Sequence, residues 1–332
     1  MNTYGSRLNP LIENAYKVLD GAALTKAEAL ELAEKIEGED ILDLVSLANK
    51  VRHKFAGTVV ACSILNAKSG LCRQNCRFCA QAEAHHTGIE TYPLLSKQEI
   101  LDAAAVAAEN GVISFGIVTS GYGYKQPTPE FQQLLETMDA MHEKFPQLKI
   151  CVSVGILSRE TAKLLAEHHC WRYNMNLQTS PERFGDLITR EHSILEKIDT
   201  IKYLQEFGVT ICCGGIFGLG ETWKDRVDMA FAVRELKVDG SPLNVLLPIK
   251  GTPLENMPVM APHDVAKAFA IYRLVNPKLM IKFAAGRETT MKDFQGLLML
   301  SGLNAMITGG YLTTRGRSVD DDKKFIGQLG KF

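Results

Sequence analysis

The chain has 332 residues, 46% of them hydrophobic, and its 37 basic and 38 acidic residues leave a formal charge of −1. This balance excludes a strongly basic nucleic-acid-binding protein and gives no reason to expect an anionic membrane partner. The N-terminal sequence MNTYGSRLNP lacks the apolar core of a signal peptide, and no apolar run approaches the roughly 18 residues that a membrane span needs. We therefore expect a cytoplasmic protein that binds neither nucleic acid nor membranes.

The first 55 residues predict an N-terminal helical extension. In the stretch TKAEALELAEKI, Thr25 stands before the first helical residue and Glu28 follows three positions later, which is the spacing of a capping box. A second helical pattern follows in DILDLVSLANKVRHKF.

Residues 56–312 alternate short apolar runs with amphipathic stretches and predict one domain. The predicted strands are GTVVACSIL, VISFGIVT, LKICVSV, WRYNMNL, VTICCGGIF, PLNVLLPI, LMIKFAA and LNAMIT. Because seven helix-like stretches separate these eight runs, we expect a parallel sheet that closes into a (β/α)8 barrel of the TIM type. The chemistry of such a barrel lies at the C-terminal ends of its strands. Residues 313–332 are polar and predict a C-terminal tail, either a terminal helix or a mobile segment.

Eight cysteines in a cytoplasmic chain point to metal binding or redox chemistry rather than to disulfides. Three of them, Cys72, Cys76 and Cys79, follow the first predicted strand with the spacing C-x3-C-x2-C. Three thiolates on one loop can hold three irons of a 4Fe–4S cluster and leave the fourth iron open. The alternative is a structural zinc site that adds His85 or His86 as its fourth ligand.

The three-cysteine spacing resembles the radical S-adenosylmethionine superfamily, and further segments resemble one family within it. These segments are NAKSGLCRQNCRFCAQ, YNMNLQTSPERFGDLIT, GGIFGLGET, KGTPLEN and AAGRE, in the order found in biotin synthases. The resemblance runs from about residue 40 to residue 315. It implies that the open iron binds S-adenosylmethionine, that one electron from the cluster generates a 5′-deoxyadenosyl radical, and that an auxiliary iron–sulfur cluster donates the sulfur that converts dethiobiotin to biotin. It also implies a homodimer, a flavodoxin or ferredoxin as electron donor, and a cysteine-desulfurase-type sulfur source.

The auxiliary cluster of that family is usually described as 2Fe–2S with three cysteines and one arginine. The resemblance matches Cys151, Cys212 and Arg287 to three of these ligands, but Gly116 stands where the remaining cysteine is expected and cannot ligate a metal. Cys62 lies on the first predicted strand, and odd-numbered strands of a barrel supply one layer of inward side chains. We therefore hypothesise that Cys62, Cys151, Cys212 and Arg287 hold a rearranged auxiliary cluster, 2Fe–2S or larger.

Simpler interpretations of these residues stay open. Free cysteines are often small buried hydrophobes, and Arg287 beside Glu288 can form an ordinary buried ion pair. Alternation along a strand predicts that Cys213 faces away from the interior if Cys212 faces into it. We expect Cys170, at a helix end, to be structural.

Amide side chains recur at the end of the fourth predicted strand. The resemblance implies that Asn174 and Asn244 hydrogen-bond the ureido ring of dethiobiotin, and that Asn176 and Gln178 meet the ribose hydroxyls of the cofactor. An amide suits a cyclic urea because it both donates and accepts hydrogen bonds. The alternative is that these amides only cap the strand end.

The remaining predicted cofactor contacts lie after the fourth and fifth predicted strands. Lys197 matches a family arginine that pairs with the cofactor carboxylate, with Arg190 as the other candidate. Gly214 and Gly215 let the backbone approach the cofactor, and Glu221 opens the next helix; such a turn is also common for purely conformational reasons.

Two other functions remain in competition with sulfur insertion. One is a different enzyme of the same superfamily, of the hydrogenase-maturation or methylornithine-synthase type, which the glycine at position 116 favours. Cys151, Cys212 and Arg287 together argue against it. The other is a zinc-stabilised binding protein without catalysis.

Overall fold

The computed structural model describes residues 8–310, 312–313 and 316–332, so residues 314 and 315 of the predicted tail lie outside the described residues. The N-terminal extension is helical, as predicted. Its elements are α1 (Pro10–Ala15), η1 (Tyr16–Asp20), α2 (Lys26–Lys35) and α3 (Asp40–Phe55). The capping box is confirmed, because the backbone N–H of Glu28 donates to Thr25 Oγ1 at 3.2 Å and Thr25 N–H donates to the Glu28 carboxylate at 2.9 Å.

A closed parallel barrel follows, also as predicted. Its strands are β1 (Val60–Lys68), β2 (Ser114–Thr119), β4 (Lys149–Ser153), β6 (Arg172–Asn174), β7 (Thr210–Cys212), β9 (Gly240–Val245), β10 (Met280–Phe283) and β11 (Ala305–Ile307). Each strand pairs in parallel with the next one around the ring, and the pairings of β10 with β9 and of β11 with β1 close it. Two short strands, β3 (Gly123–Tyr124) and β5 (Ile156–Leu157), pair with each other outside the ring.

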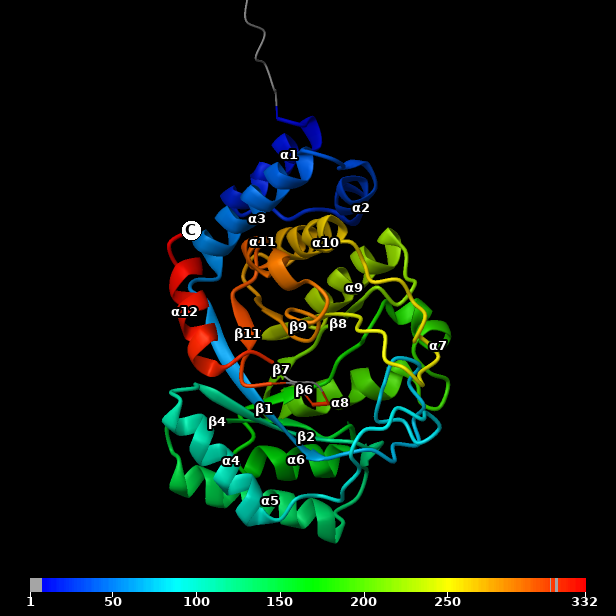
Figure 1. Cartoon of the computed structure of the whole chain (residues 1–332), viewed down its shortest axis with the longest axis vertical. Helices are drawn as coiled ribbons and strands as arrows, with labels where there is room; N and C mark the ends of the chain where they lie inside the picture. Colours follow the sequence, from blue (N-terminus) through cyan, green and yellow to red (C-terminus); the bar gives the residue numbers. More distant parts are fainter. Residues whose placement is uncertain (1–7, 311, 314–315) are drawn as a thin grey trace, which may run out of the picture.

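A helix follows each barrel strand and packs on the outside of the ring (Figure 1). These helices are α4 (Lys97–Glu109), α5 (Pro129–Lys144), α6 (Arg159–Glu167), α8 (Ile194–Glu206), α9 (Trp223–Glu235), α10 (Pro262–Val275), α11 (Gln295–Leu300) and α12 (Val319–Leu329). The shorter connecting elements are η2 (Pro181–Arg183), α7 (Phe184–Leu187), β8 (Gly215–Phe217) and η3 (Lys292–Phe294). The described part of the predicted tail is therefore mainly a terminal helix, α12, which is the eighth helix of the ring.

Strand alternation decides which side chains reach the barrel interior. On β10, Ile281 and Phe283 are fully buried among the hydrophobic residues outside the ring, where the Phe283 ring meets Phe269 of α10 edge-on at 5.1 Å. Lys282 lies between them in the sequence and therefore points to the opposite side, into the interior. This pattern places one lysine inside a barrel whose outer layer is apolar.

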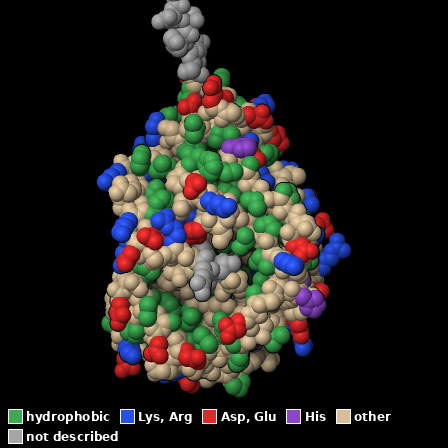
Figure 2. All heavy atoms as spheres, in the orientation of Figure 1, with side chains coloured by type: hydrophobic (Ala, Val, Ile, Leu, Met, Phe, Trp, Pro, Cys, Tyr) green, Lys and Arg blue, Asp and Glu red, His purple; other side chains and the backbone are tan. Residues whose placement is uncertain are grey.

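The N-terminal helices lie on one side of the barrel. Figure 1 shows α1, α2 and α3 beyond α10 and α11, and α3 packs against α10 while α2 packs against α9. Acidic and basic side chains are interspersed over the face seen in Figure 2, in keeping with the near-neutral charge. Within the described residues, no helix combines the length and the apolar character that crossing a membrane requires.

Candidate active site

One cavity of about 440 Å³ occupies the interior and the C-terminal end of the barrel. Its lining includes two groups of cysteines at different depths. Cys62 lies six residues before Lys68, the last residue of β1, and the loop with Cys72, Cys76 and Cys79 follows that end. At about 3.3 Å per residue, Cys62 lies roughly 20 Å from the end of β1 along the strand direction. We call the two groups the floor group, Cys62, Cys151 and Cys212, and the mouth group, Cys72, Cys76 and Cys79.

The mouth group lies on a loop that its own backbone holds closed. Cys72 N–H donates to Gln81 O at 3.0 Å, and Cys79 N–H donates to Cys76 O at 2.9 Å. Burial, with the neighbouring thiols adding to it, raises the pKa of Cys76 to about 12 and that of Cys79 to about 11. Without a metal these thiols stay protonated at neutral pH. Three thiols on one loop, all lining the cavity, are the donor set that a 4Fe–4S cluster takes, so the residues of the loop fit such a cluster.

The surroundings of the mouth group are apolar on one side. Cys76 and Phe78 pack against a cluster of buried residues that includes Phe184 and Leu254. His85, a candidate ligand of the zinc alternative, uses its Nδ1 in a 2.8 Å hydrogen bond with the carbonyl of Cys79. Among the described residues, no three Cys, His, Asp or Glu side chains are close enough together to hold a single metal ion. A 4Fe–4S cluster binds each thiolate to a different iron, so its cysteines need not meet at one point.

The floor group comes together from three strands, as the hypothesis of a rearranged site requires. Cys62 pairs with Ser114 across β1 and β2, and Gly116 pairs with Cys151 across β2 and β4. A Cβ added at Gly116 would lie 3.7 Å from the Cβ of Cys151. Cys62, Cys151 and Cys212 all line the cavity. The position that lacks its cysteine therefore belongs to the same interior space that Cys62 lines.

Arg287 does not join the floor group, which corrects the predicted set of four residues. It is fully buried but does not line the cavity, and its Nη2 forms ion pairs with Asp322, at 2.9 Å, and with Glu288. The physical reason is that β10 ends at Phe283, so strand alternation does not reach Arg287, which turns outward to α12. The simpler interpretation of Arg287 as a buried ion pair describes its contacts.

Lys282 of β10 is the basic residue that faces the floor group. Burial alone would lower the pKa of Lys282, but Cys62, Cys212 and Cys151 raise it above the ordinary value. Burial raises the pKa of Cys62, yet Lys282 and a hydrogen bond with Ser114 lower it overall. Burial raises the pKa of Cys151 to about 12. The lysine therefore favours a thiolate at Cys62 in particular.

Arg172 of β6 adds a second cation to the floor. It lines the cavity, and its Nε donates to Thr210 Oγ1 at 3.1 Å, which fixes the guanidinium. Burial raises the pKa of Cys212, while Lys282 and Arg172 act in the opposite direction. As strand alternation predicts, Cys212 lines the cavity and Cys213 does not. Cys170 is buried outside the lining, as expected of a structural residue.

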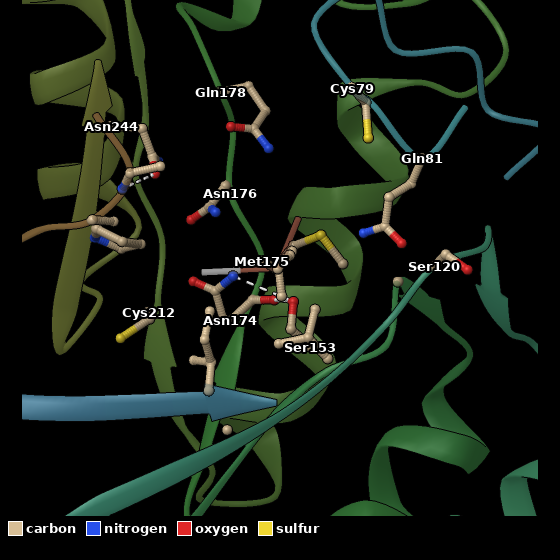
Figure 3. A pocket seen from close by; sticks show the side chains of 18 of the residues that line it. Cys79, Gln81, Ser120, Ser153, Asn174, Met175, Asn176, Gln178, Cys212 and Asn244 are labelled. Atoms are coloured by element: carbon tan, nitrogen blue, oxygen red, sulfur yellow. Dashed lines mark hydrogen bonds between the residues drawn. The ribbon is translucent and has the colours of Figure 1, made fainter. Parts of the chain in front are cut away.

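Amide side chains occupy the level between the two groups. Figure 3 shows Asn174, Asn176 and Gln178 in succession along one segment, with Cys212 and Asn244 on one side and Cys79 and Gln81 on the other. All four predicted amides, Asn174, Asn176, Gln178 and Asn244, line the cavity.

The four amides differ in what they leave open for a ligand. Asn176 Oδ1 accepts from Gly214 N–H at 3.0 Å. Both polar atoms of the Asn244 side chain are already hydrogen-bonded to backbone. Its Nδ2 donates to Gly215 O at 3.0 Å, and its Oδ1 accepts from Ala285 N–H at 2.9 Å. Asn174 Nδ2 donates to Ser153 Oγ at 3.3 Å, which leaves its Oδ1 for a ligand. Gln178 has a left-handed backbone, with φ of 72°, and a buried Oε1 that lacks a hydrogen-bond partner among the described residues. Strain and an unsatisfied polar atom at one residue are marks of a binding position.

The glycines of the predicted turn allow close backbone approach and are not part of the cavity lining. Gly214, Gly215 and Glu221 do not line the cavity. A Cβ atom added at Gly214 would lie 2.0 Å from Pro242 O, and one added at Gly215 would lie 2.6 Å from Gln178 O. Only glycine therefore fits at these two positions. Glu221 is buried and accepts hydrogen bonds from Gly218 N–H at 2.9 Å and Arg226 Nε at 2.7 Å. These three residues thus lie outside the cavity lining, and their contact with the cofactor stays a prediction.

Lys197, the candidate for the cofactor carboxylate, lies at the mouth. It lines the cavity, with its Nζ 3.7 Å from Met175 Sδ, whereas the other candidate, Arg190, is exposed and pairs with Asp186 at 3.0 Å. Burial lowers the pKa of Lys197, and Cys76 opposes this shift. Sequence reasoning missed three basic residues of the lining, Arg172, His192 and Lys282.

Two family models match the chain. The model of the Radical SAM superfamily matches residues 68–233, and that of the Biotin and Thiamin Synthesis associated domain matches residues 242–331. The chain is 52% identical over 326 residues to the biotin synthase of Chlorobium luteolum (strain DSM 273 / BCRC 81028 / 2530), with 98% of each chain covered. It is 50% identical over 331 residues to the biotin synthase of Chlorobaculum parvum (strain DSM 263 / NCIMB 8327), with 98% of this chain and 99% of the relative covered.

Solved structures resemble the fold at lower identity. The crystal structure of methylornithine synthase matches with a TM-score of 0.83 at 19% identity, covering 95% of this chain and 96% of that one. The FeFe-hydrogenase maturase HydG from Carboxydothermus hydrogenoformans matches with a TM-score of 0.79 at 18% identity, covering 97% and 78%. At such identities the likeness shows the barrel fold alone.

Proposed function

Because the chain belongs to the biotin synthase family, we propose that its cavity holds two iron–sulfur clusters, one on the mouth group and one on the floor group. The enzyme is a radical S-adenosylmethionine sulfurtransferase that uses a 4Fe–4S cluster, S-adenosylmethionine and an auxiliary iron–sulfur cluster. It converts dethiobiotin to biotin. The alternatives without sulfur insertion are not favoured, because the relatives at about 50% identity span nearly the full chain.

The mouth group would hold the 4Fe–4S cluster. Cys72, Cys76 and Cys79 supply three thiolates from one loop, and Lys197 beside them would pair with the cofactor carboxylate. As a point charge, the lysine provides attraction without the two parallel hydrogen bonds that an arginine would make. Gln178, whose Oε1 lacks a partner among the described residues, would accept from a ribose hydroxyl of the cofactor.

The floor group would hold the auxiliary cluster, with Cys62 taking the role of the cysteine that Gly116 replaces. The single observation that carries this proposal is that Cys62, Cys151 and Cys212 line one interior space and that Lys282 and Arg172 face it. The two cations would offset the negative charge that thiolates and inorganic sulfide bring. Lys282 replaces Arg287 in this proposal.

The level between the two groups would receive dethiobiotin. When bound, the first cluster supplies the electron that cleaves S-adenosylmethionine to a 5′-deoxyadenosyl radical, and the auxiliary cluster supplies the sulfur. Asn174 would hydrogen-bond the ureido ring through its open Oδ1. Asn244 already bonds two backbone groups, so its part would be to fix the wall of the cavity. The closed ring of strands surrounds the space in which the substrate would lie and would limit its contact with bulk water.

The family resemblance also supports proposals for the electron donor, the sulfur source, the compartment and the oligomeric state. A flavodoxin or ferredoxin would reduce the mouth cluster, and a cysteine-desulfurase-type donor would restore sulfur to the floor. We propose a reducing compartment such as the cytoplasm, in which the cysteines stay available to bind the clusters. A homodimer follows from the family resemblance.

Labelled sulfide tests the proposed sulfur transfer. The protein is reconstituted anaerobically with iron and ³⁴S-sulfide, then given S-adenosylmethionine, dethiobiotin and a chemical reductant for one turnover. We expect ³⁴S in biotin and an equal loss of sulfide from the protein, both abolished in Cys151→Ala. Unlabelled biotin, or labelled biotin from the Cys151→Ala variant, would contradict the proposal.

A further inference from the structure

His192 is a cavity-lining residue to which sequence reasoning gave no role. It lies between α7 and α8, directly before Ser193, whose side chain caps α8. The segment that carries it is bonded to the mouth loop at two other points. Thr189 Oγ1 donates to Gln74 O at 2.7 Å, and Arg77 N–H donates to Ile188 O at 2.9 Å. The position of His192 is therefore fixed relative to the three cysteines of the mouth group.

One ring nitrogen of His192 is already used within the protein. Its Nδ1 lies 3.0 Å from Gln74 Oε1, and because an amide oxygen only accepts, Nδ1 carries the hydrogen and donates it. The Phe184 ring packs edge-on against the imidazole at 5.4 Å, which limits its rotation. Nε2 makes no hydrogen bond to the described residues. In this tautomer, Nε2 is an acceptor left for a ligand in the cavity.

Burial, more than the neighbouring charge, keeps the ring in this form. Burial lowers the pKa of His192 to about 4, and the neighbouring Lys197 ammonium acts in the same direction. At neutral pH the imidazole therefore carries no charge. Lys197 offers a ligand a cation and His192 offers it a neutral acceptor, and the two residues lie near each other at the start of α8.

We propose that His192 binds S-adenosylmethionine, with Nε2 accepting a hydrogen bond from the amino group of the methionyl moiety. The amino-acid end of that cofactor carries a carboxylate and an N–H donor. Lys197 is complementary to the carboxylate and cannot accept a hydrogen bond, so the donor needs a separate acceptor. His192 is that acceptor, and its bond to Gln74 couples it to the loop that holds the cysteines. This inference rests on the proposed placement of the first cluster on the mouth group.

Two isosteric variants separate ligand binding from a purely structural role. His192→Asn keeps an amide nitrogen near the Nδ1 position and loses the cavity-facing acceptor, whereas His192→Gln keeps an acceptor near the Nε2 position and loses the bond to Gln74. The dissociation constant for S-adenosylmethionine is measured anaerobically on reconstituted protein, from the change in the electron paramagnetic resonance signal of the reduced mouth cluster. We expect it to rise about tenfold in His192→Asn, as for one lost hydrogen bond, and less than about threefold in His192→Gln. The opposite order would show that His192 only clamps the loop, and would overturn the inference.

Controls distinguish a failure of this inference from a failure of the proposed function on which it rests. Iron and sulfide content must equal wild type in both variants, and a Cys76→Ala variant should lose the cluster signal. If wild-type protein binds S-adenosylmethionine and His192→Asn binds it equally well, the inference alone fails. If the Cys76→Ala variant retains the signal, the proposed mouth site fails. 5′-Deoxyadenosine lacks the methionyl group, so His192→Asn should leave its affinity unchanged; a matching loss would overturn the assignment to the amino group.

Discussion

Replacing Arg287 by methionine should cost the protein stability and leave its iron content unchanged. The Arg287 guanidinium and the Asp322 carboxylate are 0% and 1% exposed and lie 2.9 Å apart. The same guanidinium donates to Gln295 Oε1 at 3.0 Å and to Ile307 O at 3.3 Å. Removing one partner of a buried ion pair leaves the other charge uncompensated, which costs about 3–5 kcal/mol. We expect a loss of that size in the free energy of unfolding.

Urea denaturation of the cluster-free protein measures this loss, and Mössbauer spectra of the reconstituted variant measure the second cluster. The double variant Arg287→Met/Asp322→Leu should regain part of the stability, because it removes both members of the most buried ion pair, whereas Glu288 still loses its ion pair with Arg287. Lys282→Met is the matched control on the same segment of chain, and it should disturb the floor cluster instead. Loss of the second cluster in Arg287→Met, with the unfolding free energy unchanged, would refute the reasoning and return Arg287 to the ligand set.

Three further predictions follow from single residues. Gly116→Cys should restore second-site iron to a Cys62→Ser variant, because the two positions line the same space; iron analysis that finds no recovery would contradict a shared site. Tyr122 holds the pKa of Glu196 at about 2 against an ordinary 4.5, so the stability this carboxylate adds is complete above about pH 4.5 and is lost as the pH falls toward 2. The stability difference between wild type and Glu196→Gln, from urea denaturation at several pH values, should shrink across that window; a constant difference would refute the assignment. Thr25→Ala should lower the unfolding free energy by about 1 kcal/mol through loss of the capping box, and no change would show that the cap is redundant.

Most of the barrel could be predicted from the sequence because local patterns decide it. All eight predicted strands occur, and the capping box at Thr25 begins α2 as expected. The run VTICCGGIF differs, because it divides into β7 and β8. At the division, Gly214 and Gly215 lie so close to neighbouring backbone that a Cβ atom would not fit. Such close approaches depend on strands distant in the sequence, so no local pattern reports them.

The interior of the site was predictable only where strand alternation applies. It predicted interior-facing side chains for Cys62, Cys151 and Cys212, which lie within strands and line the cavity; their common layer stays a hypothesis. It failed for Arg287, which lies four residues beyond the end of β10. Lys282 carried a signal that alternation could have used, since it is the one charged residue within the predicted strand LMIKFAA.

The sequence contains no comparable pattern for residues whose hydrogen-bond partners are decided by the tertiary fold. Nothing near His192 in the sequence indicates that it meets Gln74, 118 positions earlier. Glu221 looked like a cofactor contact, but its Oε1 accepts from Gly218 and Arg226 within its own turn, and only Oε2 is without a hydrogen-bond partner among the described residues. A sequence pattern identifies residue types suited to a ligand, whereas the fold decides which of them remain available.

Iron and sulfide analysis with Mössbauer spectra tests the central claim of two clusters in one cavity most directly. The protein is a Cys72/Cys76/Cys79→Ala variant, reconstituted anaerobically, alone and combined with Cys62→Ala. We predict that the triple variant keeps one cluster and that Cys62→Ala then removes it. A triple variant without iron would mean that the chain holds a single cluster, and a cluster that survives Cys62→Ala would exclude Cys62 from the second site.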